Sequence, residues 1–215
     1  MDYSILVNKD NPLPRAHIPN NLTKAESEYK DNILIDKKVK EAFDMLKKEA
    51  SKYGYHLDIE SGYRDYDYQE KIYNKLLEEK GFTYTVTRVA EPGKSEHQTG
   101  LAIDFCVYRE EKSYIEHDIK DFEETKWVHK NAHKYGFILR YPEGKEDITK
   151  YSYEPWHLRY VGSLANYLYT KNLTLEEYYN IKEKHWLLLK LMLLFKYMNK
   201  YSNEKRSHYG RKYNR

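Results

Sequence analysis

Residues 95–104 read Ser-Glu-His-Gln-Thr-Gly-Leu-Ala-Ile-Asp and place a histidine seven residues before an aspartate. His97 falls in a polar loop, whereas Asp104 falls inside the apolar run 101–107, which predicts a buried strand. A carboxylate buried alone in such a run is strongly unfavourable, so it must be paired or bound to a cation. Asp104 is therefore either the partner of a cation or a strand-end residue that caps a neighbouring turn.

Two other segments carry residues of the kind that act on substrates. Glu154 stands three residues before His157, and Pro155 excludes a helix there, so a turn at the proline can bring both side chains to one site. Arg64 follows a strand-end glycine turn and can point into a cleft. Taken singly, each residue also has a plainer interpretation: a surface glutamate, a half-buried histidine, and an arginine paired with Asp65 or Asp67.

Taken together, these residues form the ligand set of a catalytic zinc site, which would consist of His97, Asp104 and His157. Three protein ligands and one open position distinguish such a site from the closed four-ligand sites that serve structure. Zinc lowers the pKa of a bound water towards ~7, and a neighbouring carboxylate such as Glu154 can take its proton. Arg64 would supply a cation for a developing oxyanion or for a substrate carboxylate. One zinc ion per chain is the expected cofactor.

The rest of the chain predicts helices and strands in no regular alternation, which favours the α+β class. Apolar spacing and capping residues predict helices over 36–53, from Asp65 or Asp67 to Lys80, and over 123–135, 164–170 and 174–184. Short apolar or alternating runs predict strands over 55–59, 101–107, 137–141 and 157–161. We expect a small mixed or antiparallel sheet with flanking helices around a zinc cleft, plus a C-terminal helical basic tail.

Proline placement and charge divide the chain into three parts. Residues 1–21 contain Pro12, Pro14 and Pro19, which predicts an extended N-terminal arm. Residues 22–172 hold all the motifs and are expected to form the catalytic domain. Residues 173–215 are expected to form a helical and basic extension, because ten Lys or Arg and two Asp or Glu lie from Lys182 onward.

The basic extension suits peripheral contact with an anionic wall or membrane. No aromatic and basic motif of a nucleic-acid module accompanies it, so no nucleic acid is expected as a partner. The first residues lack the basic and apolar regions of a signal peptide, and no apolar run reaches the ~18 residues of a spanning helix. A single cysteine excludes an internal disulfide framework.

Three blocks carry a family resemblance: SGYRDYDYQ at 61–69, SEHQTGLAIDF at 95–105 and EPWHLRY at 154–160. In this order they closely resemble the VanY-type D-alanyl-D-alanine carboxypeptidases, zinc peptidases related to VanX dipeptidases, LD-carboxypeptidases and phage endolysin peptidases. The resemblance covers roughly residues 4–168.

The resemblance implies a role for each matching position. His97, Asp104 and His157 would bind zinc. Glu154 would be the general base and then the proton donor to the leaving amine, while Arg64 would bind and polarise the substrate. Four further residues are implied to contact substrate: Gln69 and Ser95 at the terminal D-alanine, and Tyr151 and Trp156 as lining of the pocket.

The expected activity is removal of the terminal D-alanine from peptidoglycan stem peptides that end in D-Ala-D-Ala. Because peptidoglycan lies outside the membrane, this activity is expected outside the membrane, at the cell surface. The same zinc residues would serve an LD-carboxypeptidase or an endolysin-type endopeptidase, and a wall-binding module could keep the fold and zinc without turnover. The presence of Glu154 and Arg64 favours an enzyme, because a binding module does not need a base beside the metal.

Two further histidines, His129 and His133, are spaced four residues apart in the predicted helix 123–135. This spacing could bind a metal on one helix face. Since no third ligand stands near them, we predict instead that they lie on a solvated face.

Overall fold

The structure is a computed structural model that describes residues 2–28 and 30–212, with side chains described up to residue 194. Its main sheet has five strands, in which β3 (Leu57–Ser61), β4 (Ala102–Arg109), β7 (His157–Tyr160) and β6 (Phe137–Leu139) follow one another and β5 (Lys112–Tyr114) pairs with β4. All the pairs are antiparallel. A separate hairpin joins β1 (Leu22–Lys24) to β2 (Leu34–Asp36). The α+β class and the small antiparallel sheet are therefore confirmed.

The helix predicted over 36–53 is α1 (Lys37–Ser51), and it supplies the core. Asp36 caps it by accepting a hydrogen bond from the Lys38 amide at 2.7 Å. One face is buried at the predicted spacing and packs in the core with β3, β4 and β6; its residues are Val39, Ala42, Phe43, Leu46 and Ala50. Phe43 meets Phe137 edge to face, and burying a side chain of this size stabilises the fold by roughly 1.5–3 kcal/mol.

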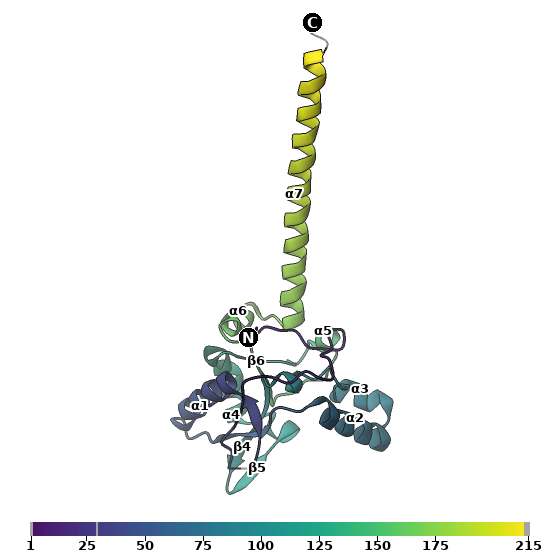
Figure 1. The fold of residues 1–215 in the computed structure, drawn as a ribbon. Helices are drawn as coiled ribbons and strands as arrows, with labels where there is room; N and C mark the ends of the chain where they lie inside the picture. The colour runs from purple at the N-terminus through teal and green to yellow at the C-terminus, as the bar shows by residue number, and fades with distance from the viewer. Residues whose placement is uncertain (1, 29, 213–215) are drawn as a thin grey trace. The chain divides into compact units, whose positions relative to one another are not determined.

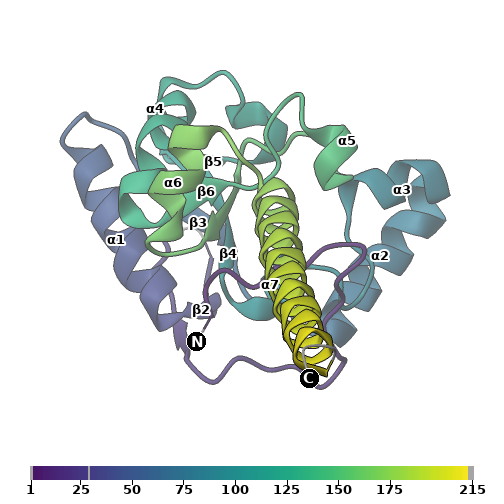
Figure 2. The ribbon, with the colours of Figure 1, turned by 90° about the horizontal axis from the view of Figure 1, so that it is seen from above.

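A second helical pair lies at the other side of the sheet from α1 (Figures 1 and 2). It consists of α2 (Tyr66–Lys80), capped as predicted by Asp65, and of α3 (Phe82–Arg88). Gly81 separates the two helices with a φ of 77°, a left-handed value that glycine adopts without strain. The sequence predicted the end of α2 at Gly81 but did not predict α3.

The remaining elements surround the ends of the sheet. They are η1 (Glu96–Thr99), η2 (Glu116–Ile119), α4 (Glu123–Asn131), η3 (Ala132–Tyr135), α5 (Glu146–Thr149), α6 (Leu164–Lys171) and α7 (Leu175–Lys212). The helix predicted over 123–135 is in fact α4 followed by η3. The other predicted helices and strands are present with ends shifted by a few residues, except that α7 extends far beyond 184.

The chain divides into two compact units, Met1–Glu176 and Glu177–Arg215. The first contains both sheets, the helices α1 to α6, and every residue of the predicted site. The second consists of the greater part of α7, where the apolar side chains between Trp186 and Leu194 are 46% to 67% exposed. Within the described residues, no helix is both long and apolar enough to cross a membrane.

Candidate metal centre

Two of the predicted ligands face each other across the centre of the sheet. Asp104 of β4 pairs directly with His157 of β7 in the antiparallel ladder. Side chains directly opposite each other in such a ladder lie on the same face of the sheet. The Oδ1 atom of Asp104 accordingly lies 3.1 Å from Nδ1 of His157.

The third predicted ligand, His97, comes from η1, which leads into β4. The Ser95 hydroxyl caps η1 by accepting a hydrogen bond from the His97 amide at 3.3 Å. The Nδ1 atom of His97 lies 2.6 Å from the carbonyl oxygen of Gly62. This contact leaves Nε2 facing Oδ2 of Asp104 at 3.2 Å.

The three side chains fit one metal ion. One candidate ligand atom of each residue lies within 4.8 Å of the others, and within the described residues this is the group that could hold an ion. The two imidazole rings stand nearly perpendicular, with centroids 5.0 Å apart. Oδ1 of Asp104 is buried and has no hydrogen-bond partner in the described part of the chain. Two imidazoles and one carboxylate are the donor set that zinc accepts in catalytic sites.

Glu154 reaches this cluster through the predicted turn at Pro155. The amide of His157 donates to the carbonyl of Glu154 at 3.3 Å, and Oε2 of Glu154 lies 3.5 Å from Nδ1 of His157. Burial raises the pKa of Glu154 to about 8, with the positive charge of His157 opposing the rise and Asp104 adding to it. A carboxyl group with such a pKa can both take and return a proton near neutral pH.

The two histidines differ in how their surroundings affect protonation. Burial lowers the pKa of His97 to about 4, helped by the charge of Arg64. Burial also acts to lower the pKa of His157, but the carboxylates of Asp104 and Glu96 outweigh it and raise the pKa to about 9. Without metal, His157 therefore carries a proton at neutral pH, which a metal ion must displace.

Arg64 points at the same cluster rather than at solvent. Its Nη1 atom lies 3.5 Å from Oδ2 of Asp104 and donates to the Ser61 hydroxyl at 2.9 Å. Its Nε atom donates to Oε1 of Gln69 at 3.0 Å, and Gln69 in turn donates to the carbonyl of Ala90 at 2.8 Å. The plainer interpretation of Arg64, an ion pair with Asp65 or Asp67, does not hold, because its guanidinium turns inward.

A cavity of about 290 Å³ opens onto the cluster. Apart from Gln69, the predicted site residues all line it: Arg64, Ser95, His97, Asp104, Tyr151, Glu154, Trp156 and His157. Gln69 is buried, and its amide is occupied by Arg64 and Ala90, so it orients Arg64. The direct contact of Gln69 with a substrate stays a prediction. A second cavity of about 460 Å³ shares Glu154 and Trp156 as lining and extends the space beside α2 and α3.

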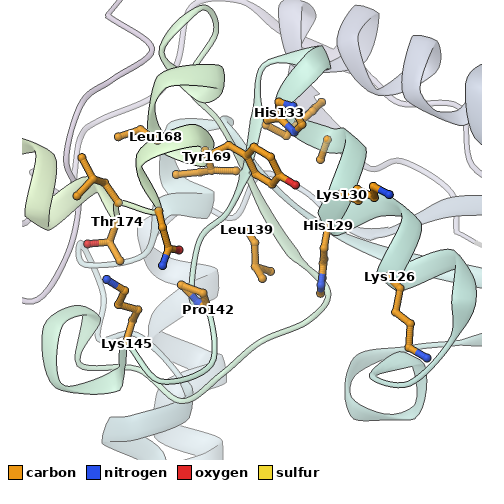
Figure 3. Close-up of a pocket in the computed structure, with 15 residues that line it drawn as sticks. Lys126, His129, Lys130, His133, Leu139, Pro142, Lys145, Leu168, Tyr169 and Thr174 are labelled. Atoms are coloured by element: carbon orange, nitrogen blue, oxygen red, sulfur yellow. The ribbon is translucent and has the colours of Figure 1, made fainter.

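The cavity in Figure 3, of about 470 Å³, contains none of the predicted site residues. Lys126, His129, Lys130 and His133 lie around it (Figure 3). His129 contacts the carbonyl of Pro155 at 2.8 Å, and the ring of His133 stacks on Tyr169. The prediction that both histidines lie on a solvated face is wrong, since each is half-buried against its own neighbour.

Sequence reasoning assigned no role to a group of charged residues behind His157. Glu96 lies next to His97 and is buried between two arginines, Arg140 and Arg159. The sequence nevertheless places both arginines in predicted strands, where Arg140 follows the apolar run Phe137–Leu139 and Arg159 follows Leu158. A charge in such a place requires a buried partner, as Asp104 does.

The glycine that supports His97 gives a testable prediction. A Cβ atom on Gly62 would collide with the Leu34 carbonyl oxygen and would lie 2.7 Å from a methyl group of Ile35. Gly62→Ala should therefore displace the end of β3, lower the free energy of unfolding by about 1–3 kcal/mol, and weaken metal binding through the Gly62 carbonyl. Denaturant unfolding and metal titration would measure the two effects.

Gly54→Ala is the matched control for this substitution. No atom lies within 4 Å of its added Cβ, although its φ of 77° strains a side chain. Gly54→Ala should lower stability without changing metal affinity. An unchanged metal affinity in Gly62→Ala would contradict the supporting role of the Gly62 carbonyl.

Comparison with solved structures gives the class of the protein. The LdcB LD-carboxypeptidase, whose structure was solved to explain peptidoglycan recognition, matches with a TM-score of 0.75 and 44% identity over 81% of this chain and 84% of that chain. The VanY D,D-pentapeptidase of the VanB-type vancomycin-resistance cassette, solved with Zn(II), matches with a TM-score of 0.72 and 34% identity over 83% of this chain and 99% of that chain. The fold is that of the peptidoglycan zinc peptidases.

Sequence comparison identifies the family. A family model for VanY, described as D-alanyl-D-alanine carboxypeptidase, matches residues 32–163. The chain belongs to this family of carboxypeptidases. A relative from Enterococcus gallinarum, the bifunctional D-Ala-D-Ala dipeptidase and carboxypeptidase VanXYC, is 37% identical over 179 residues, which are 81% of this chain and 92% of that protein.

Proposed function

We propose that the protein is a zinc-dependent carboxypeptidase that releases the terminal D-alanine from peptidoglycan stem peptides ending in D-Ala-D-Ala. It would act outside the membrane, where such peptides are found. The observation that carries the proposal is the position of Glu154. Its carboxyl group lines the same cavity as His97, Asp104 and His157, and its Oε2 atom lies 3.5 Å from Nδ1 of His157.

The chemistry assigned to each residue follows from its charge and position. His97, Asp104 and His157 would hold zinc, which when bound would polarise the scissile carbonyl and acidify the attacking water. Glu154 takes the proton of that water and later delivers it to the departing D-alanine nitrogen. Arg64, held by Ser61 and Gln69, stabilises the negative charge that develops on the carbonyl oxygen. Catalysis follows because these contacts are stronger for the oxyanion than for the neutral carbonyl.

The remaining predicted contacts concern the substrate. Ser95, Tyr151 and Trp156 line the cavity and would contact the D-alanine and the residue before it. The Tyr151 hydroxyl is buried and has no hydrogen-bond partner in the described part of the chain, so a substrate group can bind there. The Lys9 ammonium lies over the Tyr151 ring, 4.7 Å from its centroid, and helps to hold the ring in place.

The function is tested by mass spectrometry of zinc-loaded protein incubated with a synthetic pentapeptide ending in D-Ala-D-Ala. A tetrapeptide and a chelator control are run in parallel. Chelator-sensitive release of one D-alanine from the pentapeptide is the expected result. Failure to cleave either peptide, with zinc bound, would overturn the carboxypeptidase assignment and favour an endopeptidase or a wall-binding module.

A second candidate, LD-carboxypeptidase action, is favoured by the LdcB neighbour, which is 44% identical to this chain. The residues at the metal centre would serve both activities, since they act on the carbonyl and the water rather than on the preceding residue. Cleavage of the tetrapeptide alone would establish this alternative.

The C-terminal unit supports an additional role in peripheral binding to an anionic membrane or wall surface. The apolar residues between Trp186 and Leu194 are exposed on all faces of α7 rather than along one stripe, which suits a lipid environment better than a coiled-coil seam. The nine residues from 186 to 194 extend about 14 Å as a helix, about half the ~30 Å thickness of the hydrocarbon core. The basic residues on both sides would bind anionic headgroups.

Vesicle binding tests this role in the full chain. The wild-type protein should sediment with vesicles containing anionic phosphatidylglycerol, and binding should weaken as salt is raised. Leu188→Glu together with Leu191→Glu should abolish this binding and leave peptidase activity unchanged. Equal sedimentation of wild type and variant would contradict membrane binding by this segment. Binding to purified cell wall in the same assay would indicate that the basic residues bind the wall instead.

A further inference from the structure

Four buried charges form a network behind the metal centre. Glu96 of η1, Arg140 after β6, Arg159 of β7 and Glu176 at the start of α7 come from separate parts of the chain. Arg140 and Arg159 are fully buried, Glu96 is 1% exposed and Glu176 is 8% exposed. Buried charges are retained only when they are paired and hydrogen-bonded, so the contacts within this group determine what it can do.

The two oxygens of Glu96 have different neighbours. Oε1 accepts hydrogen bonds from Nε of Arg140 at 2.7 Å and from Nη1 of Arg159 at 2.6 Å. Oε2 lies 3.6 Å from Nε2 of His157. Neither Oε2 of Glu96 nor Nε2 of His157 has a hydrogen-bond partner elsewhere in the described part of the chain. These two orphaned atoms face each other.

The other nitrogen of His157 lies on the side of the metal centre. Nδ1 is 3.1 Å from Oδ1 of Asp104 and 3.5 Å from Oε2 of Glu154. An imidazole that binds a metal through one nitrogen carries its proton on the other. A metal held at Nδ1 therefore leaves an N–H at Nε2, directed at the carboxylate of Glu96.

We propose that Glu96 is a positioning residue, whose carboxylate accepts the Nε2 proton of His157 and so fixes this ligand for metal binding through Nδ1. The proposal rests on the metal site of the proposed function and deepens it. A carboxylate in this position orients the ring, sets its tautomer and makes the metal-binding nitrogen more basic. Glu96 acts through His157 and touches neither substrate nor metal.

The arginines keep the Glu96 carboxylate charged and in place. Arg140 makes a bidentate pair with Glu176 at 2.9 and 2.6 Å. Arg159 donates to the carbonyls of Tyr3 and Ile5 at 3.1 and 2.7 Å. Each guanidinium is thus held by other hydrogen bonds in addition to the one that it donates to Oε1 of Glu96. This arrangement leaves Oε2 free to accept from His157.

The test is the dissociation constant for zinc, measured by competition with a chromophoric chelator. Glu96→Gln should weaken zinc binding by about 10- to 100-fold, the range found when such an outer carboxylate is lost. Glu176→Gln is the matched control, because it removes a buried carboxylate from the far side of Arg140 without contact with His157. This control should keep the zinc affinity within about threefold of wild type.

Two results would overturn the proposal. One is a zinc affinity of Glu96→Gln within twofold of wild type. The other is an equal loss of affinity in both variants, which would mean that the network supports the fold and not His157. The thermal melting temperature of each variant is recorded beside the affinity.

A measurement on the unsubstituted protein covers the case in which Glu96→Gln fails to fold. Nitrogen-15 NMR of the zinc-loaded wild type should show the proton of His157 on Nε2 and that of His97 on Nδ1, where Gly62 accepts it. A His157 proton on Nδ1, or none on Nε2, would overturn the proposal. Neither readout involves a peptide, so loss of hydrolysis with these results intact would contradict the proposed function alone.

Discussion

Glu154→Gln should lower kcat for D-alanine release by about 10²- to 10⁴-fold, the contribution of a positioned general acid and base. The amide has the size of the protonated carboxyl group but cannot take a proton from water. Glu154 lies 3.5 Å from His157 and lines the cavity beside the three metal ligands. Because the substitution removes a base and not a ligand, the zinc content should stay at one ion per chain.

The free energy of unfolding, measured at two pH values, shows whether this variant is folded and whether the pKa of Glu154 is raised. The pKa of Glu154 is about 8 in the folded metal-free protein, against an ordinary value of 4.5. Between these values the folded chain binds a proton that the unfolded chain has lost, so this group's contribution to stability falls as pH rises. Glutamine does not titrate. Between pH 5 and pH 8, the free energy of unfolding of the variant should therefore rise by at least about 1.4 kcal/mol relative to that of wild type. This difference is the equivalent of one pKa unit.

These two results separate the role of Glu154 in catalysis from a role in folding. Denaturant unfolding of metal-free protein at pH 5 and pH 8 gives the stability, and single-substrate kinetics with the pentapeptide give kcat. Near-normal turnover in Glu154→Gln would show that another group is the base. Loss of zinc together with turnover would instead make Glu154 a ligand.

His97→Ala should abolish metal binding at ordinary zinc concentrations. If the three protein ligands share the roughly 10–16 kcal/mol typical of a zinc site, each contributes at least about 3 kcal/mol. Loss of one should therefore weaken binding at least a hundredfold. His97 is 2% exposed and its Nε2 atom faces Asp104, so its loss removes a ligand atom from the centre of the cluster. Metal analysis after dialysis against a weak chelator measures the loss.

His56→Ala is the control for this prediction. His56 precedes β3, its side chain is 44% exposed, and it pairs with Glu28 away from the metal ligands. Its replacement should leave zinc content and activity unchanged. Full zinc occupancy in His97→Ala would exclude His97 from the ligand set and would require a different assignment of the metal centre.

The sequence predicted those parts of the molecule that depend on local pattern. Helix α1 follows from apolar residues at helical spacing and from its cap at Asp36. The hairpin of β1 and β2 was not predicted, because each strand has three residues and no alternation can be recognised over that length. Helix α3 was not predicted because its threonines and valine disfavour helix locally, and packing against α2 overrides this preference.

The same distinction applies to the site. Asp104 could be proposed because it interrupts an apolar run, and His97, Glu154 and His157 could be proposed because together with it they resemble the motifs of a known family. That Asp104 lies opposite His157 depends on the register of β4 with β7, which only the folded sheet establishes. The pairs of Glu96 with Arg140 and Arg159 join residues 44 and 63 positions apart. A sequence shows that such charges need partners but not which partners they find.

The hydrogen bonds of Arg159 and Arg140 also determine when the buried charges become paired as the chain is synthesised. Arg159 binds carbonyls near the beginning of the chain, whereas the last partner of Arg140 is Glu176. A nascent chain that has already presented His97, Asp104 and His157 still has unpaired charge in its interior until Glu176 emerges. The interior charges are therefore fully paired only when the first compact unit is complete, and a chain released from the ribosome before that point should be a target for proteolysis.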